Sequence, residues 1–383
     1  MLRFRLALAA LICFTSSDVS LADGLLADGL LADGPNTEPT TSAAAPSTNS
    51  LVMPPFHALA DKTPLKLAWD AHSREDHQRW REAFHAKMIK LLGRMPESVP
   101  FEVKWAERKD FDGFVRHKVY VRSEELYWSP AYYFVPHSRQ GKAPAIVCLH
   151  GHSGIYPYIG ECDEKEQKKT KELSLDYAVY LAEHGYVTIA PVIRGWNETS
   201  AFEDARRSCR RVTMDAFLVG TTPMGLRCWD AMRLIDFLQS REEVDSDRIG
   251  VAGLSGGGTL AMYLPILDER VKLAMAGGAF SSYRSSIYAV PHCICNCLPH
   301  IMEWGEMSDV LALQAPRPLL LINGIKDDIV PIVPAREGYG YLAQVYQLLG
   351  AQENLDADFF DGPHAWSNNK TLSFLEKHFG TDK

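Results

Sequence analysis

The chain has 383 residues, of which 46% are hydrophobic and 23% are charged, a composition that excludes a disordered tail or a fibrous protein. Its 40 Lys and Arg residues against 48 Asp and Glu residues give a net charge of −8 without a basic block, so we expect neither nucleic acid nor an anionic membrane surface as a partner. No uninterrupted apolar run reaches the ~18 residues of a membrane-spanning helix, and no integral membrane segment is expected.

The first 22 residues have the three-part pattern of a secretory signal peptide. Arg3 and Arg5 precede the apolar run 6–14, and small and polar residues lead to the expected cleavage after Ala22. We therefore expect residues 1–22 to be a signal peptide and the mature protein to be secreted or periplasmic. A lipid anchor and an uncleaved anchor are the alternatives.

Residues 23–52 are expected to be a flexible, low-complexity linker. They begin with short Leu-Ala-Asp-Gly repeats, and residues 36–50 are almost wholly Thr, Ser, Ala, Pro and Asn, too polar to offset the entropy of ordering. The folded domain is expected over 53–383, with a helix and antiparallel strands in 53–140 and the catalytic core in 141–383.

The hydrophobic periodicity changes along the domain. A helix is expected over 65–95, followed by an antiparallel meander with strands at 101–105, 115–121 and 131–135. From there apolar strands alternate with helices; the strands are expected at 145–149, 187–192, 248–252, 271–276, 319–323 and 358–360, and the helices at 173–184, 223–239, 256–267, 335–349 and 371–379. This alternation predicts an α/β fold with a mostly parallel central sheet covered on both faces. Catalytic residues are expected at the carboxyl ends of its strands.

A serine lies at a strand-to-helix junction. Residues 253–257 read Gly-Leu-Ser-Gly-Gly, between the strand expected at 248–252 and the next helix. In a nucleophile elbow the serine has a strained backbone, and the residues two positions away are small because strand and helix approach closely. Gly253 and Gly257 meet this requirement. The pattern predicts Ser255 as a nucleophile; a glycine-rich structural turn is the alternative.

A serine nucleophile needs a base, and the base needs a carboxylate that orients it. His364 lies in a loop directly after the last expected strand and is the predicted base. Asp327 and Asp328 both follow the strand expected at 319–323. We favour Asp327, three residues after Gly324, and keep Asp328 as the alternative.

Two N–H donors are expected to stabilise the tetrahedral intermediate. The first is the backbone N–H of Gly256, directly after the serine. The second is expected in the turn after an early strand, where Gly151 permits a tight turn, and the N–H of His152 is preferred to that of Ser153. The side chains of His150 and His152 lack the spacing of a metal site, and no metal is expected there.

Several motifs stand in a characteristic order along residues 65–380. In chain order they are Leu-His-Gly-His (149–152), Ala-Pro-Val-Ile-Arg-Gly (190–195), Arg-Cys-Trp-Asp-Ala-Met (227–232), Gly-Leu-Ser-Gly-Gly-Gly (253–258), Gly-Glu-Met-Ser-Asp (305–309), Ala-Pro-Arg-Pro (315–318), the segment 324–331, and Gly-Pro-His-Ala-Trp (362–366). Together they resemble the α/β-hydrolases, and within them the secreted acetyl xylan esterase-like and dienelactone hydrolase-like branch.

The resemblance implies a Ser255–His364–Asp327 triad that hydrolyses carboxylic esters, among them acetyl or other acyl esters on carbohydrate, without a cofactor. The chain departs from the better-known acetyl xylan esterases in one place: Ala365 and Trp366 follow the histidine where those enzymes have a glutamate. A secreted serine esterase acting on a small-molecule or carbohydrate ester is therefore the leading hypothesis.

Two other classes of function are weighed against it. A serine peptidase or amidase of the same fold is the main alternative, although the chain has no room for the propeller that such peptidases usually carry. A non-catalytic binding protein would commonly have lost a triad residue, and none is missing here.

Three further residues are candidates for substrate binding. Arg194 and Trp196 follow an expected strand end, and Trp304 lies in the segment 281–310, where such folds place a lid or pocket wall. The alternatives are an ion pair for Arg194 and core packing for the tryptophans.

The segment 292–297 reads His-Cys-Ile-Cys-Asn-Cys. Without a second cluster of Cys or His in the sequence it does not predict a tetrahedral metal site. Export permits disulfides, and the sequence leaves two pairs open, Cys293 with Cys297 and Cys162 with Cys209.

Overall fold

The computed structural model describes residues 49–380. The chain divides into two units, Met1–Val52 and Met53–Lys383, and the second unit holds the whole of the sheet and the helices packed on it. The expected signal peptide and most of the expected linker lie outside the described residues. The first helix, α1 (Asn49–Lys62), begins within the segment expected to be linker.

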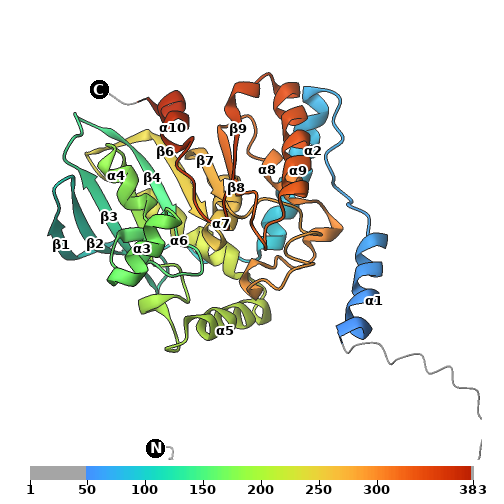
Figure 1. Cartoon of the computed structure of the whole chain (residues 1–383), viewed down its shortest axis with the longest axis horizontal. Helices are drawn as coiled ribbons and strands as arrows, with labels where there is room; N and C mark the ends of the chain where they lie inside the picture. Colours follow the sequence, from blue (N-terminus) through green and yellow to red (C-terminus); the bar gives the residue numbers. More distant parts are fainter. Residues whose placement is uncertain (1–48, 381–383) are drawn as a thin grey trace, which may run out of the picture. The chain divides into compact units, whose positions relative to one another are not determined.

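One nine-stranded mixed sheet forms the centre of the body (Figure 1). Its strands are β1 (Val103–Asp110), β2 (Phe114–Arg122), β3 (Trp128–Pro136), β4 (Ala143–Leu149), β5 (Val187–Pro191), β6 (Val244–Leu254), β7 (Val271–Gly277), β8 (Leu319–Gly324) and β9 (Leu355–Phe360). Their spatial order is β1-β2-β3-β5-β4-β6-β7-β8-β9. The pairs β1–β2, β2–β3 and β3–β5 are antiparallel, and all the other pairs are parallel. The expected meander thus continues the parallel sheet instead of standing apart from it.

Helices cover both faces of this sheet. The helices that follow α1 are α2 (Arg74–Leu92), α3 (Glu164–Glu172), α4 (Tyr177–Glu183), α5 (Ala205–Leu218), α6 (Pro223–Gln239), α7 (Gly256–Leu267), α8 (Met307–Ala312), α9 (Ile332–Leu349) and α10 (Thr371–Phe379). Alternate residues of β4 enter two different cores: Val147 and Leu149 pack with α2, α6, α7, α8 and α9, whereas Ile146 and Cys148 pack with α4 and α10. The sheet is therefore buried on both sides, as an α/β fold requires.

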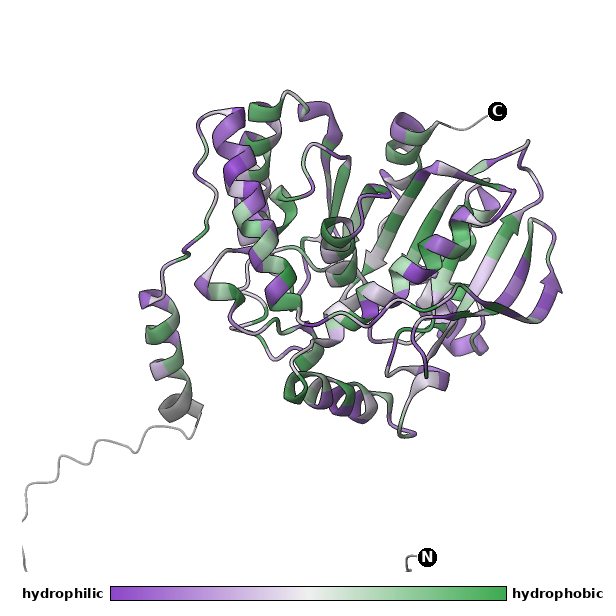
Figure 2. Cartoon of the chain, turned by 180° about the vertical axis from the view of Figure 1, so that it is seen from behind, coloured by the Kyte–Doolittle hydropathy of each residue, from purple (hydrophilic) through white to green (hydrophobic). Residues whose placement is uncertain are grey.

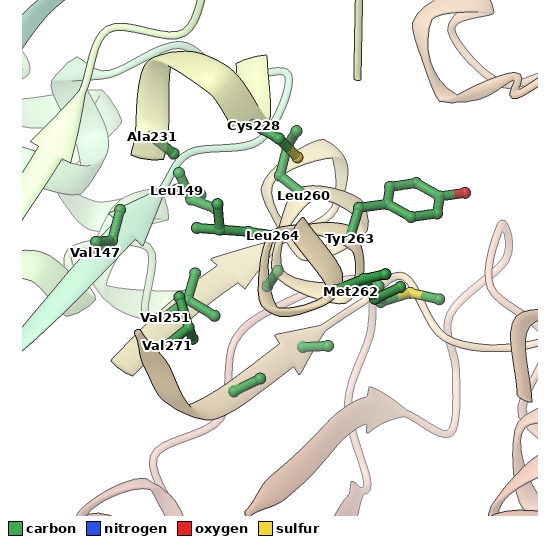
Figure 3. Close-up of a cluster of buried hydrophobic side chains, with 14 of the residues drawn as sticks. Val147, Leu149, Cys228, Ala231, Val251, Leu260, Met262, Tyr263, Leu264 and Val271 are labelled. Atoms are coloured by element: carbon green, nitrogen blue, oxygen red, sulfur yellow. The ribbon is translucent and has the colours of Figure 1, made fainter. Parts of the chain in front are cut away.

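Helix α7 lies at the centre of the larger core (Figure 3). Its Leu260 and Leu264 are buried near Leu149 of β4 and Val251 of β6. Figure 2 shows that hydrophobic residues are concentrated on the central strands, whereas the outer helices carry many hydrophilic residues. Because α7 begins directly after Ser255, this packing fixes the position of the serine.

Most expected elements are present, but several helices differ from the expectation. Helix α2 begins at Arg74, well after residue 65, because Ser73 caps it by accepting a hydrogen bond from the Asp76 N–H (3.0 Å). The helix expected at 173–184 is present as the shorter α4, and α3 precedes it in a segment where no helix was expected. Helices α5 and α8 were not expected. None of the described helices combines the length and hydropathy needed to cross a membrane.

Candidate active site

Ser255 joins β6 to α7 in a strained conformation. Its backbone angles are φ 61° and ψ −121°, a region that residues other than glycine rarely adopt. A Cβ at Gly253 would lie 2.1 Å from the Gly257 carbonyl oxygen, and a Cβ at Gly257 would lie 1.8 Å from that of Leu149. Both neighbours must therefore be glycine, and the turn has the geometry of a nucleophile elbow.

His364 and Asp327 form a hydrogen-bonded pair. The histidine Nδ1 lies 2.6 Å from Asp327 Oδ2, and the aspartate side chain is fully shielded from solvent. Asp327 Oδ1 accepts hydrogen bonds from the N–H groups of Ile329 and Val330, both at 3.0 Å. Asp328 is exposed. Of the two adjacent carboxylates, Asp327 is thus the one that holds the imidazole.

Ser255 and His364 line the same hollow, which has a volume of about 700 Å³. The Nε2 atom of His364 is buried and has no hydrogen-bond partner among residues 49–380. With Nδ1 protonated toward Asp327, Nε2 presents a lone pair that can take a proton. The imidazole also lies against Gly278, where a Cβ would be 3.0 Å from the ring.

The two expected oxyanion donors are neighbours. The N–H of Gly256 is the first of α7, where helix N–H groups lack intrahelical partners. The His152 imidazole packs directly on this glycine, since a Cβ at Gly256 would lie 2.8 Å from the ring Cε1. Neither the Gly256 nor the His152 N–H donates a hydrogen bond to any residue in 49–380.

The loop that carries His152 is held from two sides. The Gly151 N–H donates to the Tyr158 hydroxyl (3.0 Å). The His150 Nε2 accepts a hydrogen bond from the Ile193 N–H (3.0 Å), and its Nδ1 lies 2.7 Å from the Gly151 carbonyl oxygen. Full burial lowers the pKa of His150 to about 3, so this imidazole is neutral and serves as a fixed bridge to the end of β5.

Tyr177 and Trp366 brace the elbow from the other core. The Tyr177 hydroxyl donates to the Leu149 carbonyl (2.6 Å) and accepts from the Leu254 N–H (3.2 Å). Its ring stacks on Trp366, with centroids 4.5 Å apart. In the sequence Trp366 stands out only as a departure from the resembled pattern, and Tyr177 does not stand out at all. A tyrosine in an amphipathic segment gives no signal of this contact.

The three substrate-binding candidates do not line the hollow of Ser255. Arg194 forms an ion pair with Asp230 (Nη2 to Oδ1, 2.7 Å). Of the two roles expected for Arg194 from the sequence, the structure therefore shows the ion pair. Trp196 is buried and packs edge-on against His152, with centroids 5.2 Å apart. The ammonium of Lys87 lies over the Trp304 ring, with its Nζ 3.5 Å from the ring centroid.

Three cations line the hollow instead. They are Lys169 of α3 and Arg206 and Arg210 of α5, and no Asp or Glu is among the lining residues of this hollow. All three side chains are exposed, and none has an ion-pair partner within the described part of the chain. In a protein of net charge −8, this is a local excess of positive charge beside the serine. Helix α5 was not expected from sequence, so neither were these arginines.

A second, much smaller space of about 10 Å³ also adjoins Ser255 and His364. Thr259, Gly278 and Ala279 are among its lining residues. This is room for roughly one water-sized group. Ser255 and His364 thus line both this small space, here called the inner space, and the large hollow, here called the outer hollow.

Comparison with known proteins connects the chain with hydrolases and esterases. Residues 110–290 match the family model described as Acetyl xylan esterase (AXE1), a range that includes Ser255 and His152 but ends before Asp327 and His364. Over 273 residues the chain is 26% identical to YtaP of Bacillus subtilis (strain 168), a protein named as a hydrolase, covering 70% of this chain and 88% of that protein.

Solved structures give the same fold at low sequence identity. A Bacteroides fragilis NCTC 9343 protein described as an acetyl xylan esterase superposes with a TM-score of 0.69 at 19% identity, covering 80% of this chain and 81% of that one. A glucuronoyl esterase from Solibacter usitatus superposes with a TM-score of 0.62 at 15% identity, covering 84% of this chain and 100% of that one.

The fold is therefore that of the α/β-hydrolases, and the comparisons connect the chain with esterases. Over residues 110–290 it is similar in particular to the acetyl xylan esterases.

Proposed function

We propose that the protein is a secreted or periplasmic serine esterase that removes acetyl or other small acyl groups from carbohydrate through a Ser255–His364–Asp327 triad and an acyl-enzyme. The observation that carries this proposal is the buried, unpartnered Nε2 of His364, which lines the same hollow as the strained Ser255 while Nδ1 is held by Asp327. The signal-like residues 1–22 support the location.

In the acylation step His364 Nε2 takes the proton of the Ser255 hydroxyl as its oxygen attacks the ester carbonyl carbon. The carbonyl π electrons move to the oxygen, and the N–H groups of Gly256 and His152 stabilise that oxyanion. The intermediate collapses, the bond to the sugar oxygen breaks, and His364 returns the proton to the leaving alcohol. Asp327 stabilises the imidazolium between these transfers without taking its proton.

Deacylation repeats the same steps with water as the nucleophile. His364 takes a proton from water, the hydroxide adds to the acyl carbon, and Ser255 leaves with the proton that His364 returns. The products are the free acid and the regenerated enzyme. No step needs a redox group or a metal ion at the reacting carbon, because proton transfer and oxyanion binding supply the catalysis.

The two spaces around Ser255 favour a small acyl group and a large alcohol. The inner space of about 10 Å³ suits the methyl of an acetyl ester, whereas the outer hollow of about 700 Å³ can take sugar residues. The cations Lys169, Arg206 and Arg210 at the outer hollow further favour a carbohydrate that carries a carboxylate. We therefore infer an acetylated, acidic carbohydrate as the preferred substrate class.

A substrate panel with a serine variant tests this proposal. Acetylated neutral xylo-oligosaccharides, acetylated uronic acid-bearing ones, a uronic acid ester of an alcohol and an amide analogue would be compared with wild-type enzyme and with Ser255→Ala. We expect turnover of the acetyl esters, with the acidic ones preferred, and loss of at least ~10³-fold in the variant. Faster cleavage of the amide, or a variant within about tenfold of wild type, would contradict the proposal.

A further inference from the structure

Four side chains with soft or borderline metal-binding atoms meet beside the active site. They are His152 from the loop after β4, Cys209 from α5, and Cys293 and Cys295 from the segment around the short 3-10 helix η3 (Ile294–Asn296). Their ligand atoms all lie within 4.8 Å of one another. A metal site was not expected here because the sequence shows no second cluster. The fold supplies it, since Cys209 lies 84 residues from Cys293 in sequence and comes next to it in space.

The separations approach those of a tetrahedral zinc site. Cys209 Sγ lies 3.6 Å from Cys293 Sγ, Cys293 Sγ lies 3.5 Å from Cys295 Sγ, and His152 Nε2 lies 3.1 Å from Cys295 Sγ. Zn–S bonds of about 2.3 Å place two sulfur ligands roughly 3.8 Å apart in a tetrahedron. A disulfide requires a sulfur separation of about 2.05 Å, and the three cysteines keep free thiols in the structure.

A buried positive charge next to the cluster points to an anion there. Arg227 is 5% exposed, and its Nη2 donates to Cys209 Sγ (3.2 Å). Its other hydrogen bonds go to the backbone carbonyl of Arg194 (3.0 and 3.2 Å). Within residues 49–380 no carboxylate forms an ion pair with this guanidinium. A buried charge without a counter-charge is costly, so the sulfur cluster is the available source of negative charge.

We propose that His152, Cys209, Cys293 and Cys295 bind one Zn²⁺ ion in a closed tetrahedral site. Three thiolates and a neutral imidazole around Zn²⁺ carry a net charge of −1, which the guanidinium of Arg227 balances. On binding, three thiols each release a proton and four metal–ligand bonds form, with no change of oxidation state. Soft sulfur with one imidazole is a donor set that selects Zn²⁺ over Mg²⁺ or Ca²⁺.

The ion would cross-link three segments that are far apart in the sequence. It would link helix α5, the segment 293–297 and the loop that carries His152. Because the same imidazole packs on Gly256, the site would also hold the His152 backbone where the oxyanion forms. That last consequence rests on the proposed function, whereas metal binding itself does not.

Metal analysis of the exported protein tests the proposal directly. The protein would be purified without chelator or reductant, dialysed with Zn²⁺, and freed of loosely bound ions before elemental analysis. We expect about one Zn²⁺ per chain and, in denaturant with chelator, a full count of free thiols. Replacement of Zn²⁺ by Co²⁺ should give thiolate-to-cobalt charge-transfer bands and the visible bands of tetrahedral Co²⁺.

Two cysteine variants give a matched comparison. Cys295→Ser removes a proposed ligand, whereas Cys297→Ser changes a cysteine two residues further along the same segment that is not in the cluster. Metal content should fall from about one ion per chain to near zero in C295S and stay near one in C297S. If C295S fails to fold, the cobalt spectrum of the wild type still decides whether thiolates bind the ion.

Three results would overturn the proposal. They are a wild-type protein that retains no ion, a thiol count that is two short because Cys209 and Cys293 form a disulfide, and equal metal content in C295S and C297S. Zinc in stoichiometric amount with no esterase activity would leave this site standing and contradict the proposed function alone. If both hold, removal of the ion should lower kcat by about tenfold or more, and added Zn²⁺ should restore it.

Discussion

The Asp327 carboxylate lies 2.6 Å from Nδ1 of His364 and is fully shielded from solvent, while the adjacent Asp328 is exposed. Adjacent residues in an extended turn point in different directions, so only one of these carboxylates can reach the imidazole. The two further hydrogen bonds from backbone N–H groups to Asp327 keep its other oxygen in place.

The first prediction compares these two aspartates. Asp327→Asn keeps the shape of the side chain but favours the wrong histidine tautomer, and turnover should fall by up to ~10⁴-fold. Asp328→Asn should lower turnover by less than about tenfold, because the exposed carboxylate has no contact with His364. Rates would be measured on one activated acetyl ester with both variants checked for folding. A larger loss in D328N would move the acid to that position.

The second prediction concerns the close approach at the elbow. Gly257→Ala would place a methyl 1.8 Å from the Leu149 carbonyl oxygen, so strand and helix must separate. We expect a loss of more than ~3 kcal/mol in the free energy of unfolding or no folded protein at all. Denaturant unfolding of both this variant and a control glycine variant would measure it.

Gly340→Ala is the control for that variant. This residue lies in α9 with nothing within 4 Å of an added Cβ, and alanine should stabilise the helix by about 0.5–1 kcal/mol. Equal stability of G257A and G340A would contradict the packing described for the elbow.

The third prediction is a pH dependence of stability caused by His150. Its pKa is lowered by burial from an ordinary value near 6.5 to about 3, so the unfolded chain binds the proton more strongly than the folded one. The free energy of unfolding should therefore fall as the pH drops below about 6.5 and continue to fall toward 3. The slope from this one group is up to ~1.4 kcal/mol per pH unit.

Comparison with His150→Gln isolates this effect from that of the carboxylates. The free energy of unfolding would be measured in urea at pH 6.5 and at pH 5. Between these two pH values it should fall by up to ~2 kcal/mol more in the wild type than in the variant. Parallel losses in the two proteins would mean that His150 is not held neutral in the folded state.

The fourth prediction concerns the cations of α5. Arg206→Gln and Arg210→Gln should each raise KM for an acetylated acidic oligosaccharide by roughly two- to fivefold, the scale of exposed charge pairs, while leaving neutral acetyl esters unaffected. Arg207→Gln is the matched control, since Arg207 lies over the Phe202 ring and does not line the hollow. The preference should weaken at high salt. Equal effects on acidic and neutral esters would contradict a carboxylate-binding role.

Much of the central fold could be predicted from the sequence, because its strands are continuous apolar runs bounded by turns. Helices α7 and α10 have the bounds expected for them. The expected serine, histidine and Asp327 come to one edge of the sheet because parallel strands end there. Helix α5 was missed because its sequence, ARRSCRRVTMDAFL, is mostly polar, and the residues that it buries are small: Ser208, Cys209, Thr213 and Ala216.

What the sequence could not supply are contacts between distant segments. Nothing in the sequence indicates that Cys209 would lie beside Cys293, or that Arg194 would pair with Asp230 instead of reaching the substrate. Such contacts depend on how a helix or loop crosses the end of the sheet. They are set by tertiary packing, and the sequence pattern around each residue does not predict them.

Covalent labelling of the nucleophile is the measurement that tests the central claim most directly. The mature protein would be treated with a fluorophosphonate, digested, and its modified peptide identified by mass spectrometry, with His364→Ala as a comparison. We expect one label per chain, on Ser255, with the rate of labelling lowered by ~10³-fold or more in the variant because the serine has lost its base. A label on another residue, or unchanged labelling in the variant, would contradict the assignment of Ser255 and His364 as nucleophile and base.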